Sequence, residues 1–136
     1  MLFRSLKGGG GKNAAQQQPQ SIEIKANFTA KKLHLLSGIA GWGFPSTKDE
    51  VPAMKLTLTH EDGKTEVTEM KNGVEFSDYN HVVEVPGSTL VEDLVKRGQL
   101  RLISVEVKQA TPVVKLTLES YDNGVTPVVV AITAGK

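Results

Sequence analysis

The chain has 136 residues, no cysteine, and sixteen Lys and Arg against fifteen Asp and Glu, which gives a net charge of +1. The length fits one domain of common size. The balanced charge argues against a dedicated nucleic-acid binder, which would be strongly basic, and no apolar run approaches the roughly 18 to 20 residues of a membrane span. We therefore expect neither a nucleic-acid partner nor a transmembrane segment. The missing cysteine excludes disulfides and a thiolate metal site.

Residues 1–20 differ in composition from the rest of the chain. A glycine run at 8–11 is followed by a Gln- and Pro-rich stretch at 16–20, without apolar periodicity. Such a tract cannot bury enough apolar surface to offset its ordering entropy, so we predict a disordered linker over 1–20 and one folded domain over 21–136. Residues 2–5 also match what a sequencing-adapter end encodes, so the chain could equally be a fragment with a missing upstream part. Residues 1–7 lack the apolar region of a signal peptide.

From Ser21 onward, hydrophobic residues recur with a period of two, which is the pattern of half-buried strands. Strands are predicted at 21–24, 53–59, 64–70, 102–108, 113–119 and 127–133. Asp62 and Gly63 predict a tight hairpin between the second and third of them. Four strands have predicted apolar faces, namely Met54, Leu56 and Leu58; Ile103, Val105 and Val107; Val114, Leu116 and Leu118; and Val128, Val130 and Ile132.

The stretch from Ser88 to Lys96 is the only one with a helical pattern, because Ser88 or Thr89 could cap a helix that ends before Gly98. We predict one or two helical turns there. About eight strands with short connections and no repeating helices predict an all-β fold, a jelly-roll β-sandwich of antiparallel strands.

The most distinctive segment, residues 38–45, contains the only Trp, a second aromatic residue, three glycines and a proline. This composition is typical of a loop at the rim of a sandwich. Trp42 and Phe44 could present flat apolar faces to a ligand, or Trp42 could fold inward and close one end of the core. Residues 72–79 form the second candidate surface, where Asp78 and Tyr79 could line a pocket and His81 follows closely. The predicted ligand-binding residues are Trp42, Phe44, Asp78, Tyr79 and His81.

Motifs for catalysis or cofactor binding are weak. The tract Gly8–Asn13 lacks the Ser or Thr and the flanking strand and helix of a phosphate-binding loop. Ser88, His81 and Asp78 could form a triad on paper, but no G-x-S-x-G elbow surrounds any serine. We therefore predict a protein that is not an enzyme and has no cofactor.

The three histidines show no local zinc motif, so no metal site is predicted. His60 precedes the Asp62–Gly63 turn and is expected to be solvated, whereas His34 is expected in the core or on a sheet face. Oxygen ligands from Asp78, or from Asp122 with Asn123, remain an alternative for a structural cation.

Several segments together resemble a known family. Lys32–Gly38 followed by Gly41–Pro45 is similar to a conserved segment of galactose-binding-like β-sandwich domains. The runs 57–66, 76–79, 85–88 and 127–133 resemble C-terminal domains of large secreted bacterial proteins, where such a domain follows catalytic, cytochrome-like or dehydrogenase-like modules. The resemblance covers about residues 21–134.

The resemblance implies a jelly-roll module, related to carbohydrate-binding and NPCBM-like domains, on an extracellular or periplasmic protein. It does not show that this copy binds sugar, because a fold does not fix a function. Two hypotheses follow. The chain is an accessory module that binds a carbohydrate through the residues named above, or it is a structural domain that docks onto an upstream module through an apolar sheet face.

Overall fold

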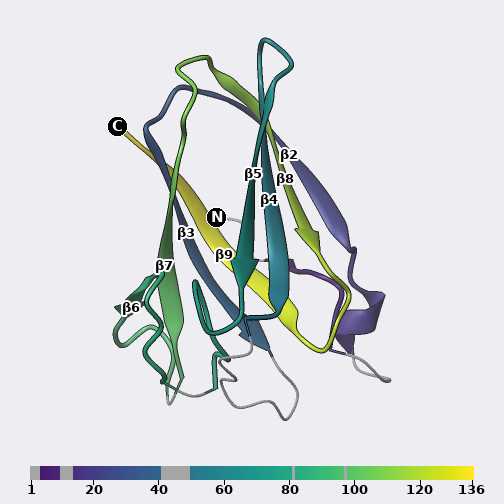
Figure 1. Cartoon of the computed structure of the whole chain (residues 1–136). Helices are drawn as coiled ribbons and strands as arrows, with labels where there is room; N and C mark the ends of the chain where they lie inside the picture. The colour runs from purple at the N-terminus through teal and green to yellow at the C-terminus, as the bar shows by residue number, and fades with distance from the viewer. Residues whose placement is uncertain (1–3, 10–13, 41–49, 81, 97) are drawn as a thin grey trace.

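The computed structural model describes residues 4–9, 14–40, 50–80, 82–96 and 98–136. Within this part of the chain, nine strands and one short 3-10 helix form two stacked sheets (Figure 1). The elements are β1 (Arg4–Ser5), η1 (Ala14–Gln17), β2 (Ser21–Phe28), β3 (Lys32–Ala40), β4 (Pro52–His60), β5 (Thr65–Lys71), β6 (Thr89–Val91), β7 (Leu100–Glu106), β8 (Val113–Ser120) and β9 (Thr126–Gly135).

One sheet has the strand order β1-β9-β3-β7-β6 and the other β2-β8-β4-β5. All pairings between these strands are antiparallel. The two-sheet sandwich confirms the predicted fold class, whereas the strand order does not confirm the jelly-roll connectivity predicted within it. In the described residues, no helix is long and apolar enough to cross a membrane.

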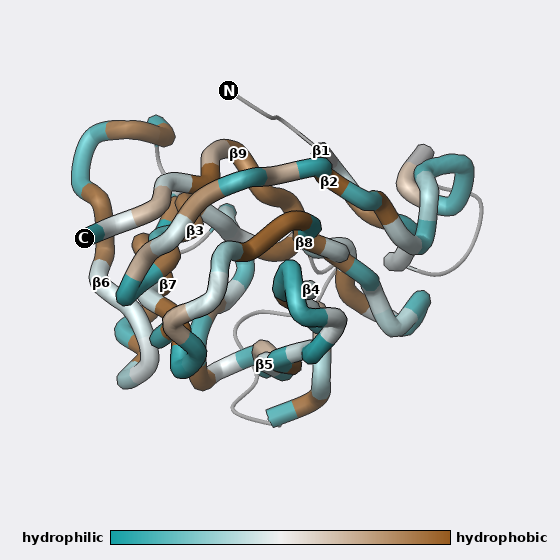
Figure 2. The backbone as a smooth tube through the Cα atoms, turned by 90° about the horizontal axis from the view of Figure 1, so that it is seen from above, coloured by the Kyte–Doolittle hydropathy of each residue, from teal (hydrophilic) through white to brown (hydrophobic). Residues whose placement is uncertain are grey.

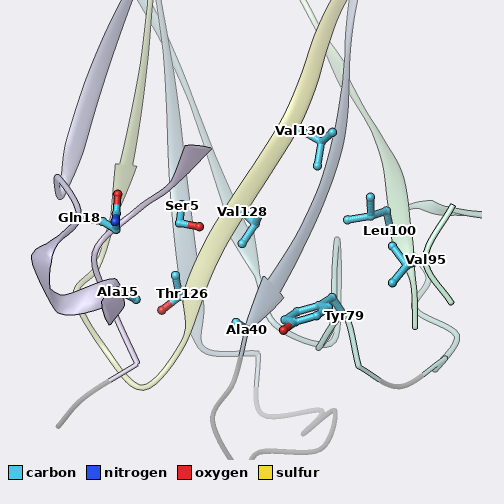
Figure 3. A pocket seen from close by; sticks show the side chains of 10 residues that line it. All are labelled: Ser5, Ala15, Gln18, Ala40, Tyr79, Val95, Leu100, Thr126, Val128 and Val130. Carbon is cyan, nitrogen blue, oxygen red and sulfur yellow. The ribbon is translucent and has the colours of Figure 1, made fainter. Parts of the chain in front are cut away.

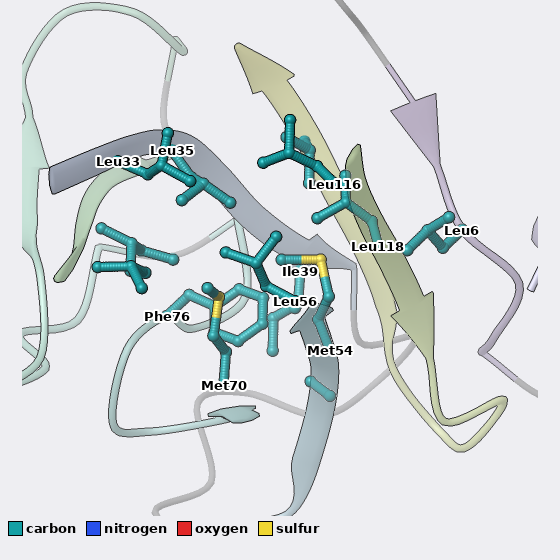
Figure 4. Packing of buried hydrophobic residues seen from close by; sticks show 14 of the residues in the cluster. Leu6, Leu33, Leu35, Ile39, Met54, Leu56, Met70, Phe76, Leu116 and Leu118 are labelled. Atoms are coloured by element: carbon teal, nitrogen blue, oxygen red, sulfur yellow. The ribbon is translucent and has the colours of Figure 1, made fainter. Parts of the chain in front are cut away.

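The core lies between the two sheets and follows from the alternation of the sequence. Along β2, exposed residues alternate with partly buried ones, and the alternation of hydrophilic and hydrophobic residues is visible in Figure 2. The inward side chains interlock around Phe76 and two methionines (Figure 4). The fully or nearly fully buried ones include Leu33, Leu35, Ile39, Met54, Leu56, Leu58, Met70, Phe76, Ile103 and Leu118. The predicted faces of β4 and β7 are confirmed, with Val107 packing against the core from just beyond β7.

Two predicted faces are correct only in part, because each strand contains an irregularity. Leu116 and Leu118 of β8 and Ile132 of β9 lie at the core as predicted, whereas Val114, Val128 and Val130 do not. In β9 the pairing with β3 shifts between Leu36 and Ser37. Val129 is therefore fully buried, while Val128 and Val130 line a pocket on the outer surface. In β8 the pairing with β2 shifts between Val113 and Lys115, at the start of β8. Val113 is therefore buried, whereas Val114 is only partly buried. An extra residue in one strand reverses the side-chain alternation beyond it.

The predicted helical turns at 88–96 are wrong. Residues Thr89–Val91 form strand β6, which pairs with Leu100–Leu102 of β7, and turns and bends follow over residues 92–96. Asp93 has φ 60°, a left-handed conformation that interrupts any right-handed helix. Pairing with a neighbouring strand satisfies more backbone groups than a helix of one or two turns, whose nucleation is costly.

The described parts of the N-terminal segment contribute to the sandwich. Arg4 and Ser5 pair with Val129 and Val128 of β9, and the Leu6 N–H donates to the carbonyl oxygen of Pro127. Leu6 is 0 % exposed and belongs to the core cluster (Figure 4). Lys7 forms an ion pair with Asp122 at 2.9 Å. Residues 4–7 are therefore part of the folded unit, which extends beyond the predicted boundary at residue 21.

Candidate functional site

The outer face of the four-stranded sheet is charged. Lys55 forms an ion pair with Glu119 at 3.0 Å, and Lys115 does so with Glu23 at 2.9 Å. The Tyr121 hydroxyl donates to the Glu69 carboxylate at 2.6 Å. This hydrogen bond raises the pKa of Tyr121 to about 12, together with burial and the negative charges of Glu69 and Glu119. The charged side chains on this face pair with one another, and such a polar surface is typical of one exposed to solvent.

The outer face of the five-stranded sheet is apolar in one part, whereas Lys32, His34, Ser104 and Glu106 make the other part polar. Along β3, β7 and β9, outward side chains alternate with inward ones. No outward side chain is charged from Leu36 to Ala40 of β3, from Leu100 to Leu102 of β7, or from Thr126 to Val130 of β9. Leu102 is 37 % exposed. We call this surface the apolar face, and it consists of Leu36, Gly38, Ala40, Leu100, Leu102, Thr126, Val128 and Val130.

A pocket of about 440 Å³ lies at one end of the apolar face (Figure 3). Tyr79, Val95 and Leu100 stand on one side of it, Ala15, Gln18 and Ser5 on the other, and β9 crosses between them. Thr126 lines the pocket and is only 2 % exposed, and its hydroxyl has no hydrogen-bond partner among the described residues. The pocket therefore has mainly apolar walls, with one buried hydroxyl group beside them that has no partner among the described residues.

Tyr79 is held in place by its backbone. Its N–H donates to the Ile39 carbonyl oxygen at 2.9 Å, and its own carbonyl oxygen accepts from the Gln99 N–H at 2.7 Å. Residues 77–79 thus lie between the ends of β3 and β7. Asp78 forms an isolated parallel β-bridge with Ile39. These contacts fix the backbone of Tyr79, whose side chain is 38 % exposed.

Gly38 permits the close packing beside this segment. A Cβ atom at this position would lie 3.3 Å from Cδ2 of Leu100 and 3.5 Å from Cβ of Tyr79. Any larger side chain would compete with Leu100 and Tyr79 for the same space above β3. The glycine therefore lets these two residues lie side by side at the pocket.

The predicted ligand residues have different fates. Trp42, Phe44 and His81 lie outside the described residues. Tyr79 lines the pocket, whereas its neighbour Asp78 is 5 % exposed, and Oδ1 of Asp78 accepts from the Asn80 N–H at 2.8 Å. The described structure thus brings Tyr79 together with Thr126, Ser5 and Gln18, none of which the sequence reasoning selected.

A buried arginine lies on the inner side of the same sheet and was also missed. Arg101 is 0 % exposed, and its guanidinium donates to the side chains of Ser88 and Gln99 and to three backbone carbonyl groups, those of Val83, Val85 and Ser88. The Ser88 hydroxyl accepts from Nε at 2.6 Å, so this serine supports the loop that carries Val83 and Val85. The available signal was the phase of β7, which places Arg101 on the same face as Ile103 and Val105.

The described residues contain no group of three or more His, Asp or Glu side chains that could hold a metal ion. Asp122 is paired with Lys7, and Asn123 binds the Pro52 carbonyl oxygen and the Val125 N–H. His34 lies on the sheet face, as one of its predicted alternatives, with Nδ1 2.8 Å from the Ser104 hydroxyl.

The prediction that His60 is solvated is wrong. His60 is 1 % exposed, with Nε2 2.9 Å from the Glu66 carboxylate and Nδ1 2.8 Å from the Thr111 carbonyl oxygen. Glu66 also accepts from the backbone N–H groups of Lys108 and Gln109. Through these hydrogen bonds, His60 and Glu66 hold the β4–β5 hairpin against the loop before β8.

We expect the stability of the domain to depend on pH through Glu66. Burial alone would raise the pKa of Glu66, but the N–H groups of Lys108 and Gln109 and the His60 ring outweigh it, and the pKa lies below its usual 4.5. A lowered folded-state pKa means that the stabilisation is present above about pH 4.5 and is lost as the pH falls through the folded-state value. Glu66→Gln should lower the free energy of unfolding at pH 7 by about 1 to 3 kcal/mol.

Urea denaturation of both proteins between pH 7 and pH 3 measures this effect. The Glu66→Gln variant should show a weaker loss of stability on acidification than the parent chain. Glu23→Gln is the matched control, since Glu23 is exposed and forms a surface ion pair with Lys115. Equal pH profiles for the parent chain and the Glu66→Gln variant would contradict the assignment.

Comparisons with protein families, curated proteins and solved structures returned no match to this chain. The likeness to galactose-binding-like domains therefore rests on the sequence motifs alone. The function must be inferred from the geometry of the two faces and of the pocket.

Proposed function

We propose that this chain is a non-catalytic accessory module that binds another folded protein domain through the apolar face. The observation that supports this proposal is the contrast between the two sheets. Three charged or hydrogen-bonded pairs lie on the outer face of the four-stranded sheet, while one part of the corresponding face of the five-stranded sheet presents aliphatic side chains. Contiguous apolar surface that is not needed for the core is characteristic of an interaction site.

The partner proposed for this face is a domain with a complementary apolar patch. The pocket offers its anchor point, because a pocket that receives one large side chain supplies much of the binding energy at many protein interfaces. Leu94, the sequence neighbour of the pocket residue Val95, is a further exposed apolar residue, with 52 % of its surface accessible. In the setting that the sequence resemblance implies, the partner is an upstream domain of the same extracellular or periplasmic protein.

Leu102 is suited to test the docking face, because it is exposed enough to be replaced without leaving a cavity in the core. A photoreactive amino acid at position 102 should cross-link to the partner in the native source, and the same group at Val67, on β5 of the other sheet, should not. With the purified partner, calorimetry should show that Leu102→Lys weakens binding by about tenfold or more, since a charge is then buried at the interface. Val67→Lys is the matched control.

Equal affinities of the Leu102→Lys and Val67→Lys variants would overturn the proposal, provided that circular dichroism shows both to be folded. A partner that cross-links equally at both positions would also contradict it. Loss of binding only in the variant at position 102 is the expected result.

Carbohydrate binding is a second candidate, and the pocket supports it. The partly exposed Tyr79 ring could stack on a sugar, and the buried Thr126 hydroxyl with Ser5 and Gln18 could bind its hydroxyl groups. This candidate differs from protein docking in its dependence on Tyr79. A polysaccharide panel, followed by Trp42 fluorescence and by calorimetry, would detect a glycan whose binding is lost on Tyr79→Ala but retained on Leu102→Lys.

A further inference from the structure

The open side of the sandwich, between β2 and β9, contains an apolar groove. It has a volume of about 530 Å³ and leads toward the core, because its lining includes residues that pack on the core yet remain partly exposed. Ile24, Ala26 and Phe28 contribute from β2, and Ile132 contributes from β9. Leu33 and Leu116 lie deeper and are almost fully buried. The groove therefore has buried core residues at its base and partly exposed apolar residues along its sides.

Among the described residues, the part of β9 beside the groove has a hydrogen-bonding edge without a strand partner. The Gly135 carbonyl oxygen accepts from the Lys31 N–H, and Thr133 lies opposite His34, so these two residues of β9 face β3. Backbone groups alternate in direction along an antiparallel strand. Those of Ile132 and Ala134 therefore point away from β3, toward the groove side. Among the described residues, β1 pairs with that side of β9 only at Val128 and Val129.

The short strand β1 shows which kind of partner this edge accepts. Arg4 and Ser5 run antiparallel to β9, and the next residue, Leu6, inserts its side chain fully into the core. At Val128 and Val129, an extended segment thus pairs with the edge of β9, and its Leu6 side chain fills the space between the sheets. Further along the same edge, at Ile132 and Ala134, β9 offers the same two features. These are backbone groups that point away from β3 and an adjacent apolar groove.

We propose that the groove accepts an added β-strand from a second polypeptide, antiparallel to β9 and in line with β1. The added strand would pair with Ile132 and Ala134 and place alternate apolar side chains against Phe28 and Ile24. The partner class is therefore an extended peptide segment with apolar residues at every second position. Strand addition combines backbone hydrogen bonds, which provide affinity, with side-chain pockets, which provide selectivity. An open edge beside an apolar groove is the surface that favours it.

This site is independent of the proposed docking face, because the groove residues belong to the side of the sandwich and the docking residues to the outer face of one sheet. Leu102→Lys should therefore leave strand addition unchanged. The two proposals can fail separately.

The test uses the full chain and a synthetic octapeptide in which Val alternates with Thr and Lys. Amide exchange is followed by NMR with and without the peptide. The amides of Ile132 and Ala134 should exchange at least about tenfold more slowly in the complex, because they become hydrogen-bonded. Amides on the outer edge of β5 should keep their rates.

Two controls make the test specific. A peptide with proline at its central position cannot complete the ladder and should give no protection. Ala134→Lys places a charged chain in the groove from an exposed position and should abolish peptide binding, whereas Val67→Lys on the β5 edge should not. Failure of the alternating peptide to protect Ile132 and Ala134, or equal protection at β5, would overturn the proposal. Should Ala134→Lys not fold, the proline peptide gives the same decision.

Discussion

Replacing Arg101 with methionine is expected to lower the free energy of unfolding by about 3 to 5 kcal/mol, because it leaves several buried acceptors without a donor. The guanidinium is 0 % exposed and binds the carbonyl groups of Val83, Val85 and Ser88. Its only ionic partner, among the described residues, is the largely exposed Glu84 at 3.5 Å. Most of the effect should therefore come from the lost hydrogen bonds and not from a lost ion pair. Urea denaturation at pH 7 measures it.

The matched control is Lys115→Met, which removes a cation of the surface pair with Glu23 and should cost no more than about 1 kcal/mol. Arg101→Lys separates charge from geometry, because lysine keeps the charge but has no planar fork of donors. It should be intermediate in stability. A Met variant as stable as the Lys115→Met control would show that the loop at 83–88 does not depend on the guanidinium.

The second large effect is expected at Leu6. Leu6→Ala should destabilise the domain by about 2 to 5 kcal/mol, since it removes a fully buried side chain and leaves a cavity between the sheets. Thermal or urea unfolding of the whole chain measures the change. Gln17→Ala is the control, because Gln17 lies in the same N-terminal segment but is exposed.

A Leu6→Ala variant with unchanged stability would mean that residues 4–7 do not belong to the cooperative unit. That outcome would restore the interpretation of the whole N-terminal segment as a linker. A loss confined to the Leu6 variant would place the first strand within the sandwich.

The sequence was sufficient for the fold class and for the faces of regular strands. Alternating residues in β4 and β7 face the core as predicted, because the pairing of β7 with β3 is regular and the shifts in β4 lie outside the stretch from Met54 to Leu58. The face of β9 was not predictable, since the shift opposite Leu36 and Ser37 depends on the partner strand. Leu6 was missed for a related reason. A single buried leucine in a glycine-rich tract has no periodicity, and its burial depends on the distant strand β9.

The candidate site was only partly predictable. Tyr79 was selected as a polar and aromatic neighbour of Asp78, and the structure places it at the pocket. Thr126, Ser5 and Gln18 come from segments more than forty residues away in the sequence, so only the pairing of β1, β3 and β9 brings them together. His60 was misjudged because its surroundings are built by Glu66 and the loop at 108–111, which approach only after the hairpin closes.

The most direct test of the proposed docking face uses the absence of cysteine from the chain. Single cysteines are placed at Leu102, on the apolar face, and at Val67, on the charged sheet, and both variants are labelled with a maleimide. In the isolated domain both positions should react. In the native assembly, position 102 should be protected at least about tenfold relative to position 67, because a partner domain covers the apolar face. Equal labelling of the two positions in the native assembly would contradict the account.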